Sequence, residues 1–260
     1  MNTKKILITL IVSCLISCEN SQEMNNIADG NEIELRSGDS GSFDYTVIPG
    51  TEAWNQLVTE QERIDVLQIP EGILDNLSPD DAVRLYITFP SFGHFTAFNT
   101  PQEGFDIMLS RYNILRHILS RKDVGGSLIA VYKDATLSGF KTLPYSNDFW
   151  SLKLFYIELM LSQKDFLKSL TTEEKLELIT EVRTKYFEKL GDENFSSLPE
   201  ALFSLKIMAS ILYVDEYHEL MSSSQRDTII EFINTGWLFE KAVPIEEIGS
   251  MIDNYINNKG

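Results

Sequence analysis

The protein has 260 residues, of which 43% are apolar and 28 are aromatic, so it can bury a sizeable core and is not wholly disordered. Its 39 acidic and 22 basic residues give a formal net charge of −17, which argues against a general nucleic-acid-binding surface because phosphates would be repelled. With two cysteines and three histidines, a disulfide scaffold and a cysteine-rich zinc module are excluded.

Residues 1–17 are predicted to be a lipoprotein signal peptide. Lys4 and Lys5 form a short positive region, and an apolar run over residues 6–16 follows, which is too short to span a bilayer stably. The run ends at Leu15–Cys18 (LISC), which looks like a bacterial lipobox. We therefore expect cleavage before Cys18 and attachment of acyl chains to its sulfur, which at about 0.8 kcal/mol per buried methylene make a membrane anchor.

Other interpretations of this segment remain. Ile11–Cys14 is a second possible lipobox, but cleavage there would leave Leu15 and Ile16 in the mature chain and shorten the apolar region. An ordinary secretory signal and a core helix are further alternatives. Cleavage before Cys18 removes Cys14, so the mature chain would have no cysteine pair for an internal disulfide.

Residues 18–50 are predicted to be a flexible acidic tether. Residues 19–50 contain seven acidic residues and one arginine, and no apolar periodicity lasts longer than one helical turn. Such a segment repels itself and cannot bury enough apolar surface to fold alone. The remaining charge, −13, belongs to residues 51–260.

Residues 51–260 are predicted to form an all-α domain, because helix-start signals recur and strand signals are scarce. Ser78 and Thr100 are each followed by a proline and an acid, the order expected for an N-cap and a first turn. Capping boxes are predicted at residues 171–174, 197–200 and 222–225. The short run over residues 127–132 (SLIAVY) could be a helix or a strand.

Apolar periodicity supports these starts. One helical face follows Pro101 and a second follows Thr171, ending near Gly191. The first face is formed by Phe105, Met108, Leu109, Tyr112, Leu115 and Leu119, and the second by Leu176, Ile179, Val182, Tyr186, Phe187 and Leu190. Residues 152–161 and 201–214 are strongly apolar but shorter than a membrane span, so we expect them to be core helices.

The predicted starts are spaced by 20 to 27 residues, and two such steps approach the length of a HEAT-type helix pair. A short HEAT-like helical array and an irregular multi-helix bundle both fit this spacing. No side-chain motif repeats at that period, so the sequence leaves both arrangements open.

The most unusual stretch is Phe89–Phe98, in which phenylalanine recurs every third residue. An aromatic platform for a sugar or an apolar ligand is one interpretation. An aromatic-packed connection between two helices is the interpretation we favour, since phenylalanine has no polar group and suits a core.

No catalytic, cofactor or metal site is predicted. His94, His117 and His218 have no histidine partner at the spacing of a metal-binding helix, and no nucleotide-binding or nucleophile-elbow motif is present. We expect His117 to be solvated and Arg116 to extend toward solvent or to pair with an acid. Three acid pairs could in principle do acid–base chemistry, but all lie in predicted first turns, where carboxylates favour the helix dipole. These pairs are Asp80-Asp81, Glu173-Glu174 and Glu246-Glu247.

Part of the chain resembles a group of uncharacterised lipoproteins and secreted proteins of Bacteroides-type bacteria. The resemblance rests on Pro49–Trp54, Gln68–Glu71, Phe89–Phe98 and Thr100–Phe105, and covers about residues 49–121. It implies a cell-envelope protein, most simply an outer-membrane lipoprotein. It implies no activity and no functional residues. Because the acids after Cys18 are separated, the membrane face stays open.

These observations predict a lipid-anchored envelope protein whose helical domain is a non-catalytic binding or scaffold module for a protein partner. Two alternatives stay open. One is an inhibitor or immunity-type lipoprotein that binds a basic protein, because an acidic surface speeds association with such a partner. The other is an unfamiliar enzyme acting on glycans through two carboxylates across a cleft.

Overall fold

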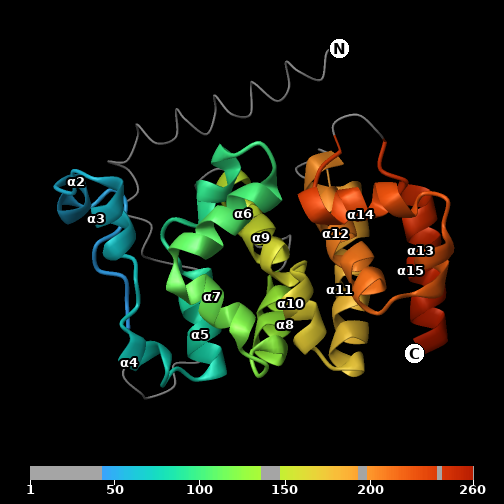
Figure 1. Ribbon diagram of the computed structural model, residues 1–260, viewed down its shortest axis with the longest axis horizontal. Helices are drawn as coiled ribbons and strands as arrows, with labels where there is room; N and C mark the ends of the chain where they lie inside the picture. Colours follow the sequence, from blue (N-terminus) through green and yellow to red (C-terminus); the bar gives the residue numbers. More distant parts are fainter. Residues whose placement is uncertain (1–42, 136–146, 193–197, 239–241, 260) are drawn as a thin grey trace, which may run out of the picture.

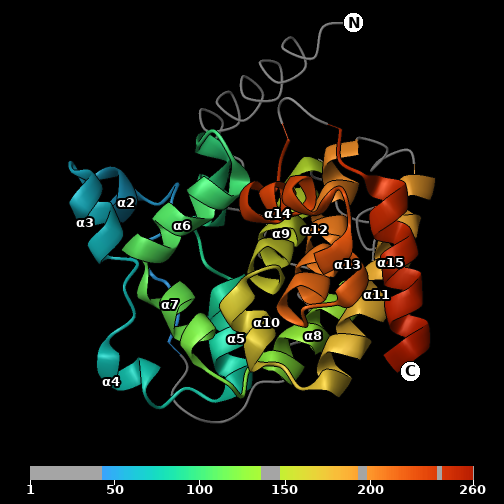
Figure 2. The same ribbon diagram turned by 45° about the vertical axis from the view of Figure 1, so that its right-hand side comes forward.

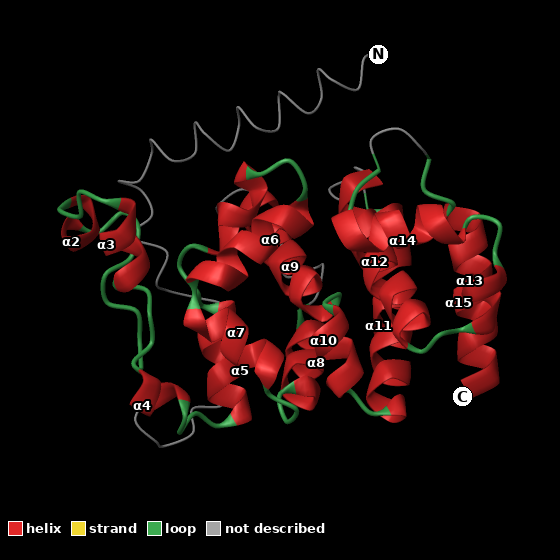
Figure 3. Cartoon of the chain, in the orientation of Figure 1, coloured by secondary structure: helices red, strands yellow, loops and turns green. Residues whose placement is uncertain are grey.

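The computed structural model describes residues 43–135, 147–192, 198–238 and 242–259, and this part of the chain is all-α (Figure 3). No strand occurs among these residues, which confirms the predicted fold class. The first half contains α2 (Glu52–Asn55), α3 (Glu60–Asp65), α4 (Glu71–Leu74), α5 (Pro79–Ile87), the 3-10 helix η2 (Phe92–Ala97), α6 (Pro101–Arg111), α7 (Asn113–Ser120) and α8 (Gly125–Asp134). The second half contains α9 (Asn147–Leu161), α10 (Lys164–Ser169), α11 (Thr172–Gly191), α12 (Leu198–Val214), α13 (His218–Ser222), α14 (Arg226–Thr235) and α15 (Ile245–Lys259).

Several of these helices begin where their capping residues predict. The Ser78 side chain accepts a hydrogen bond from the Asp81 amide at the start of α5, and Thr100 does the same for the Glu103 amide at the start of α6. Thr171 and Glu174 form a reciprocal capping box at the start of α11. The undecided run over residues 127–132 lies within α8 and is helical.

Two predictions of local structure were wrong. The helix expected to run from Pro101 past Leu115 breaks at Tyr112, whose extended backbone (φ −113°, ψ 127°) separates α6 from α7. The capping box expected at residues 222–225 is absent, because Ser222 ends α13 and its hydroxyl donates to the His218 carbonyl. In both places the local sequence pattern runs past the end of a helix. The chain turns there because of tertiary packing, which the local pattern does not reveal.

The chain enters the domain before the expected boundary at residue 51. Phe43 and Tyr45 pack against the core, although both lie in the segment assigned to the tether. Arg84 of α5 holds this entry, because its guanidinium donates to the Phe43 carbonyl at 3.2 Å and lies 3.1 Å from the Asp44 carboxylate. The folded part therefore includes residues from Phe43 onward.

Along the longest axis the helices broadly follow the order of the chain, with α2–α4 at one end and α15 at the other (Figures 1 and 2). A helical array would have this progression, but its repeats would contact only their neighbours. Instead α14 packs against α6, which is not its neighbour in the chain, and α12 packs against α9, α10, α11, α13, α14 and α15. The arrangement is therefore that of an irregular bundle built around α12.

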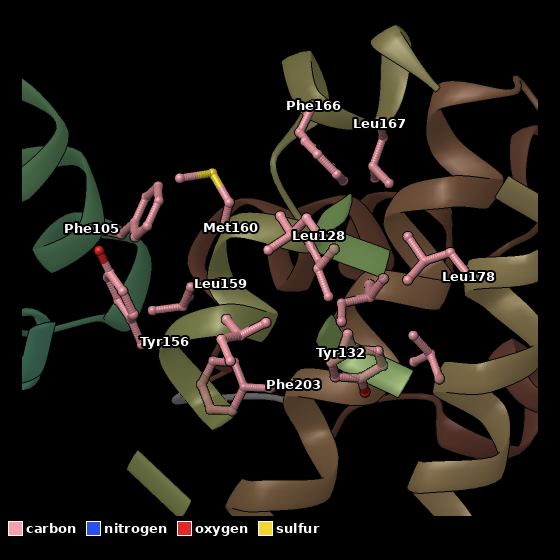
Figure 4. Packing of buried hydrophobic residues seen from close by; sticks show 14 of the residues in the cluster. Phe105, Leu128, Tyr132, Tyr156, Leu159, Met160, Phe166, Leu167, Leu178 and Phe203 are labelled. Atoms are coloured by element: carbon pink, nitrogen blue, oxygen red, sulfur yellow. The ribbon is translucent and has the colours of Figure 1, made fainter. Parts of the chain in front are cut away.

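Buried apolar side chains join these helices into one core. Figure 4 shows side chains from several helices converging, among them Phe105 of α6, Tyr132 of α8, Met160 of α9, Leu178 of α11 and Phe203 of α12. The apolar runs over residues 152–161 and 201–214 lie within α9 and α12, as predicted for core helices. Among the described helices, none combines the length and the apolar character that crossing a membrane requires.

Candidate functional site

A charged cluster lies at the centre of the bundle, where α8, α9, α11 and α12 meet. The Lys189 ammonium lies 2.7 and 2.8 Å from the two carboxylate oxygens of Glu158. Ser204 donates to Glu158 at 2.8 Å and accepts from Lys189 at 3.0 Å, and the Tyr132 hydroxyl donates to Glu158 at 2.7 Å. No side chain in this cluster is more than 2% exposed.

The hydrogen bonds of the buried cluster connect the four helices structurally. A serine hydroxyl beside a lysine amine can act as a nucleophile and its base, but only when the amine is free to accept a proton. Here Glu158 takes two hydrogen bonds from the Lys189 amine, and solvent does not reach either group. Burial and the nearby Glu158 carboxylate raise the pKa of Tyr132, so its hydroxyl stays a donor. Each helix thus contributes one polar group, and Glu158 accepts hydrogen bonds from the other three.

A second buried amine belongs to Lys206 of α12. Its Nζ donates to Gln102 Oε1 at 2.5 Å and to Ser162 Oγ at 3.2 Å. Burial lowers the pKa of Lys206 to about 7, with Lys164 adding to the fall and the Asp106 carboxylate opposing it. At neutral pH this amine is therefore divided between its charged and neutral forms.

The phenylalanine-rich stretch is part of the core. Phe89, Phe92 and Phe95 are buried, and their rings pack against Tyr112, Tyr156 and Phe155 at centroid distances of 4.7, 5.9 and 4.7 Å. This confirms the interpretation of an aromatic-packed connection, formed by η2 between α5 and α6. These three rings are not available to a ligand.

The histidines do not assemble into a site. His94, His117 and His218 lie on η2, α7 and α13, and no group of three or more potential metal ligands occurs among the described residues. The surrounding protein partly desolvates His94 and His117 and so lowers the pKa of each, with neighbouring arginines adding to both effects. His117 was expected to be solvated, and it is partly buried, with Nε2 3.5 Å from an Arg121 nitrogen.

The predicted positions of the acid pairs are confirmed, since each pair lies in a first helical turn. Asp81 accepts from the Ser78 hydroxyl at 2.6 Å, and Asp80 accepts from Ser127 at the same distance. Arg116 was expected to extend toward solvent or to pair with an acid. It is exposed, and its guanidinium donates to the carbonyls of Leu109 and Ser110 near the end of α6.

An open depression of about 400 Å³ lies on the surface between α8 and α11. Its charged lining consists of Lys133 from α8 and three glutamates at successive turns of α11, namely Glu173, Glu177 and Glu181. Lys133 pairs with Glu177 at 2.6 Å, so the net charge of the lining is −2. Leu176 and Thr180 complete the lining. Such a surface favours a cationic group of a partner.

Sequence reasoning missed Glu158, Lys189, Lys206 and the depression. A signal for Lys189 was present, because it follows Val182 by seven residues and falls on the apolar face of the predicted helix. Glu158 and Lys206 interrupt apolar runs that were expected to be buried. A charge within a buried stripe indicates a buried partner, although it does not say which one.

Cys18, the predicted lipidation site, and the rest of the tether up to residue 42 lie outside the described residues. Comparison of the chain with protein-family models, with curated proteins and with solved structures finds no match.

Proposed function

We propose that this protein is a lipid-anchored cell-envelope protein, held to the outer membrane through acyl chains on Cys18, whose helical domain binds a protein partner without catalysis. The observation that carries the anchor is the sequence Leu15–Cys18 behind a short apolar run. The Bacteroides-type resemblance supports the same compartment.

The geometry of the domain supports binding over catalysis. Its best-formed polar cluster, around Glu158 and Lys189, is enclosed by four helices and serves their packing. The surface depression between α8 and α11 is open, which suits contact with another macromolecule. Its three carboxylates project from one helix, and two of them pair with lysines, an arrangement that does not favour a glycan-acting acid pair across a cleft.

A metabolic label tests the anchor. Cells of a Gram-negative host that express the full chain are supplied with a labelled fatty acid, and the purified protein is analysed for the label. We expect incorporation into the wild type and none into Cys18→Ala, with Cys14→Ala as the matched control that keeps its label. Label that persists in Cys18→Ala would rule out this anchor.

The inhibitor-type alternative shares the anchor and differs in its partner, which would be a basic protein. The negative lining of the depression favours it. The association rate with such a partner should fall as salt rises, because screening weakens electrostatic steering. A rate that does not change with salt would contradict this alternative.

A further inference from the structure

The outward face of α11 is a continuous exposed stripe. The helix buries Leu178, Ile179 and Val182 on its inner side, where it packs against α12, α8 and α15. On the outer side, helical spacing aligns side chains over the whole length of α11, about 30 Å. The exposed residues of this stripe are Glu173, Glu177, Thr180, Thr184, Phe187 and Glu188, with Leu190 at its margin.

The end of this stripe near Gly191 exposes two apolar side chains beside Glu188. Among the described residues, three large hydrophobic side chains are markedly exposed, and two of them, Phe187 (55%) and Leu190 (46%), lie three residues apart on α11. The Arg183 guanidinium lies 5.2 Å from the centroid of the Phe187 ring and is itself fixed by Asp253 of α15 at 2.8 Å. Phe187 is therefore held in an exposed position on a rigid helix, which is typical of an aromatic residue that anchors a protein partner.

The other end of the stripe is negative. Glu173 makes no hydrogen bond or ion pair with the described residues, and Lys133 is the single cation that lines the depression. A cationic side chain entering there would meet the Glu173 carboxylate, beside Glu177 and Glu181, which pair with Lys133 and Lys185. The exposed face of α11 therefore differs between its two ends, so a partner would bind it in one orientation.

We propose that the outward face of α11 docks a basic amphipathic helix of a partner protein. Lysine or arginine side chains of that helix enter the depression beside Glu173 and Glu177, and its apolar side chains cover Phe187 and Leu190. Charge complementarity selects this occupant: a second copy of the chain would present the same acidic face, and an anionic lipid surface would be repelled.

This inference rests on the proposed binding function and is tested independently of the anchor. The probe is a fluorescent synthetic peptide of leucine and lysine, patterned as an amphipathic helix of about 14 residues, the length needed to reach from the depression to Phe187. Its binding to the full chain in a non-ionic detergent is followed by fluorescence anisotropy. We expect saturable binding that weakens as salt rises.

Matched variants locate the site. E173K/E177K should weaken binding at least tenfold, whereas E71K/E246K, which makes the same change in net charge at exposed first turns elsewhere, should change it less than twofold. F187A should weaken binding severalfold without changing its salt dependence. Circular dichroism should show that each variant keeps its helices.

Three outcomes would overturn the inference: no binding to the wild type, an equal loss in E71K/E246K, or unchanged affinity in F187A. The first two would mean that α11 holds no directed site for a basic helix, and the third that its apolar end takes no part. None of them bears on fatty-acid labelling of Cys18, so a failure here is distinguishable from a failure of the proposed anchor.

Discussion

Lys189 of α11 and Glu158 of α9 form an ion pair that is almost completely withheld from solvent, with the ammonium 2.7 and 2.8 Å from the two carboxylate oxygens. Ser204 and Tyr132 complete it from α12 and α8. Buried pairs of this kind stabilise little over a well-packed apolar pair, but breaking one leaves an uncompensated charge. Their effect is to make wrong packings of the four helices costly.

The first prediction concerns this pair. Lys189→Met should reduce the free energy of unfolding by about 3–5 kcal/mol, because it leaves the Glu158 carboxylate buried without its cation. The double variant K189M/E158L should recover most of that loss. Urea denaturation followed by circular dichroism measures both, and a single variant that costs less than about 1 kcal/mol would show that the charges are not buried as described.

The second prediction concerns pH. The pKa of Lys206 is about 7 in the folded protein and 10.5 in the unfolded chain, so the unfolded chain binds more protons between these values. Stability should therefore rise as the pH increases from about 7 toward 10.5, and the full penalty should be present below pH 7. Lys206→Met should remove this rise and stabilise the protein at pH 7 by on the order of 2–4 kcal/mol.

Exposed Lys168 provides the control for that experiment, since Lys168→Met should leave the pH dependence unchanged. Thermal unfolding across the same pH range gives the measurement. If Lys206→Met followed the same curve as the wild type, the buried amine would not be the source of the pH dependence.

The third prediction concerns a close approach of two backbones. A Cβ atom on Gly104 of α6 would lie 2.1 Å from the Phe95 carbonyl oxygen of η2, so a side chain there must push the two helices apart. Gly104→Ala should destabilise the protein by about 1–3 kcal/mol or more. Gly249 of α15 has nothing within 4 Å of the same position, so Gly249→Ala should stabilise by about 0.5–1 kcal/mol. Equal effects at the two sites would contradict the packing of α6 on η2.

The fourth prediction concerns Asn113, which begins α7 and ties down the segment before α4. Its side-chain oxygen accepts from the Ile69 amide at 3.1 Å, and its nitrogen donates to the Ile69 carbonyl at 2.6 Å. Asn113→Ala should cost about 1–3 kcal/mol and speed hydrogen exchange of the Ile69 amide, because both backbone groups lose their partner. Asn76→Ala, at an exposed position, should change stability by less than about 0.5 kcal/mol. Slow exchange of Ile69 in the Asn113 variant would show that other groups hold this segment.

Much of the helical structure could be predicted because local chemistry determines it. Ser78, Thr100 and Thr171 cap the helices that they were expected to start. The short helices α2, α3, α4, α7, α10 and α13 were not predicted, since four to eight residues carry too little periodicity. Contacts between distant residues, such as Lys189 with Glu158, depend on how the helices pack, and no local pattern specifies that.

The surface site could be predicted even less. The glutamates at residues 173, 177 and 181 were visible as helical spacing, but the depression requires Lys133 from another helix. The apolar face predicted for this helix included Phe187 and Leu190, which are exposed, because the amphipathic pattern does not say where the neighbouring helices end. Phe187 and Leu190 fit the apolar pattern of the core but lie outside the core, and this difference between pattern and structure marks the exposed surface.

The position of α12 in the sequence sets the order in which this protein can fold. Six helices pack against α12, yet α12 begins at Leu198, when three quarters of the chain has already been made. A nascent chain that stops before this point lacks the element around which its second half assembles, and so exposes apolar surface of α9, α10 and α11. Cooperative folding must therefore wait for the last quarter of the chain, and truncation there should leave an aggregation-prone product where a stack of independent repeats would leave a shorter folded one.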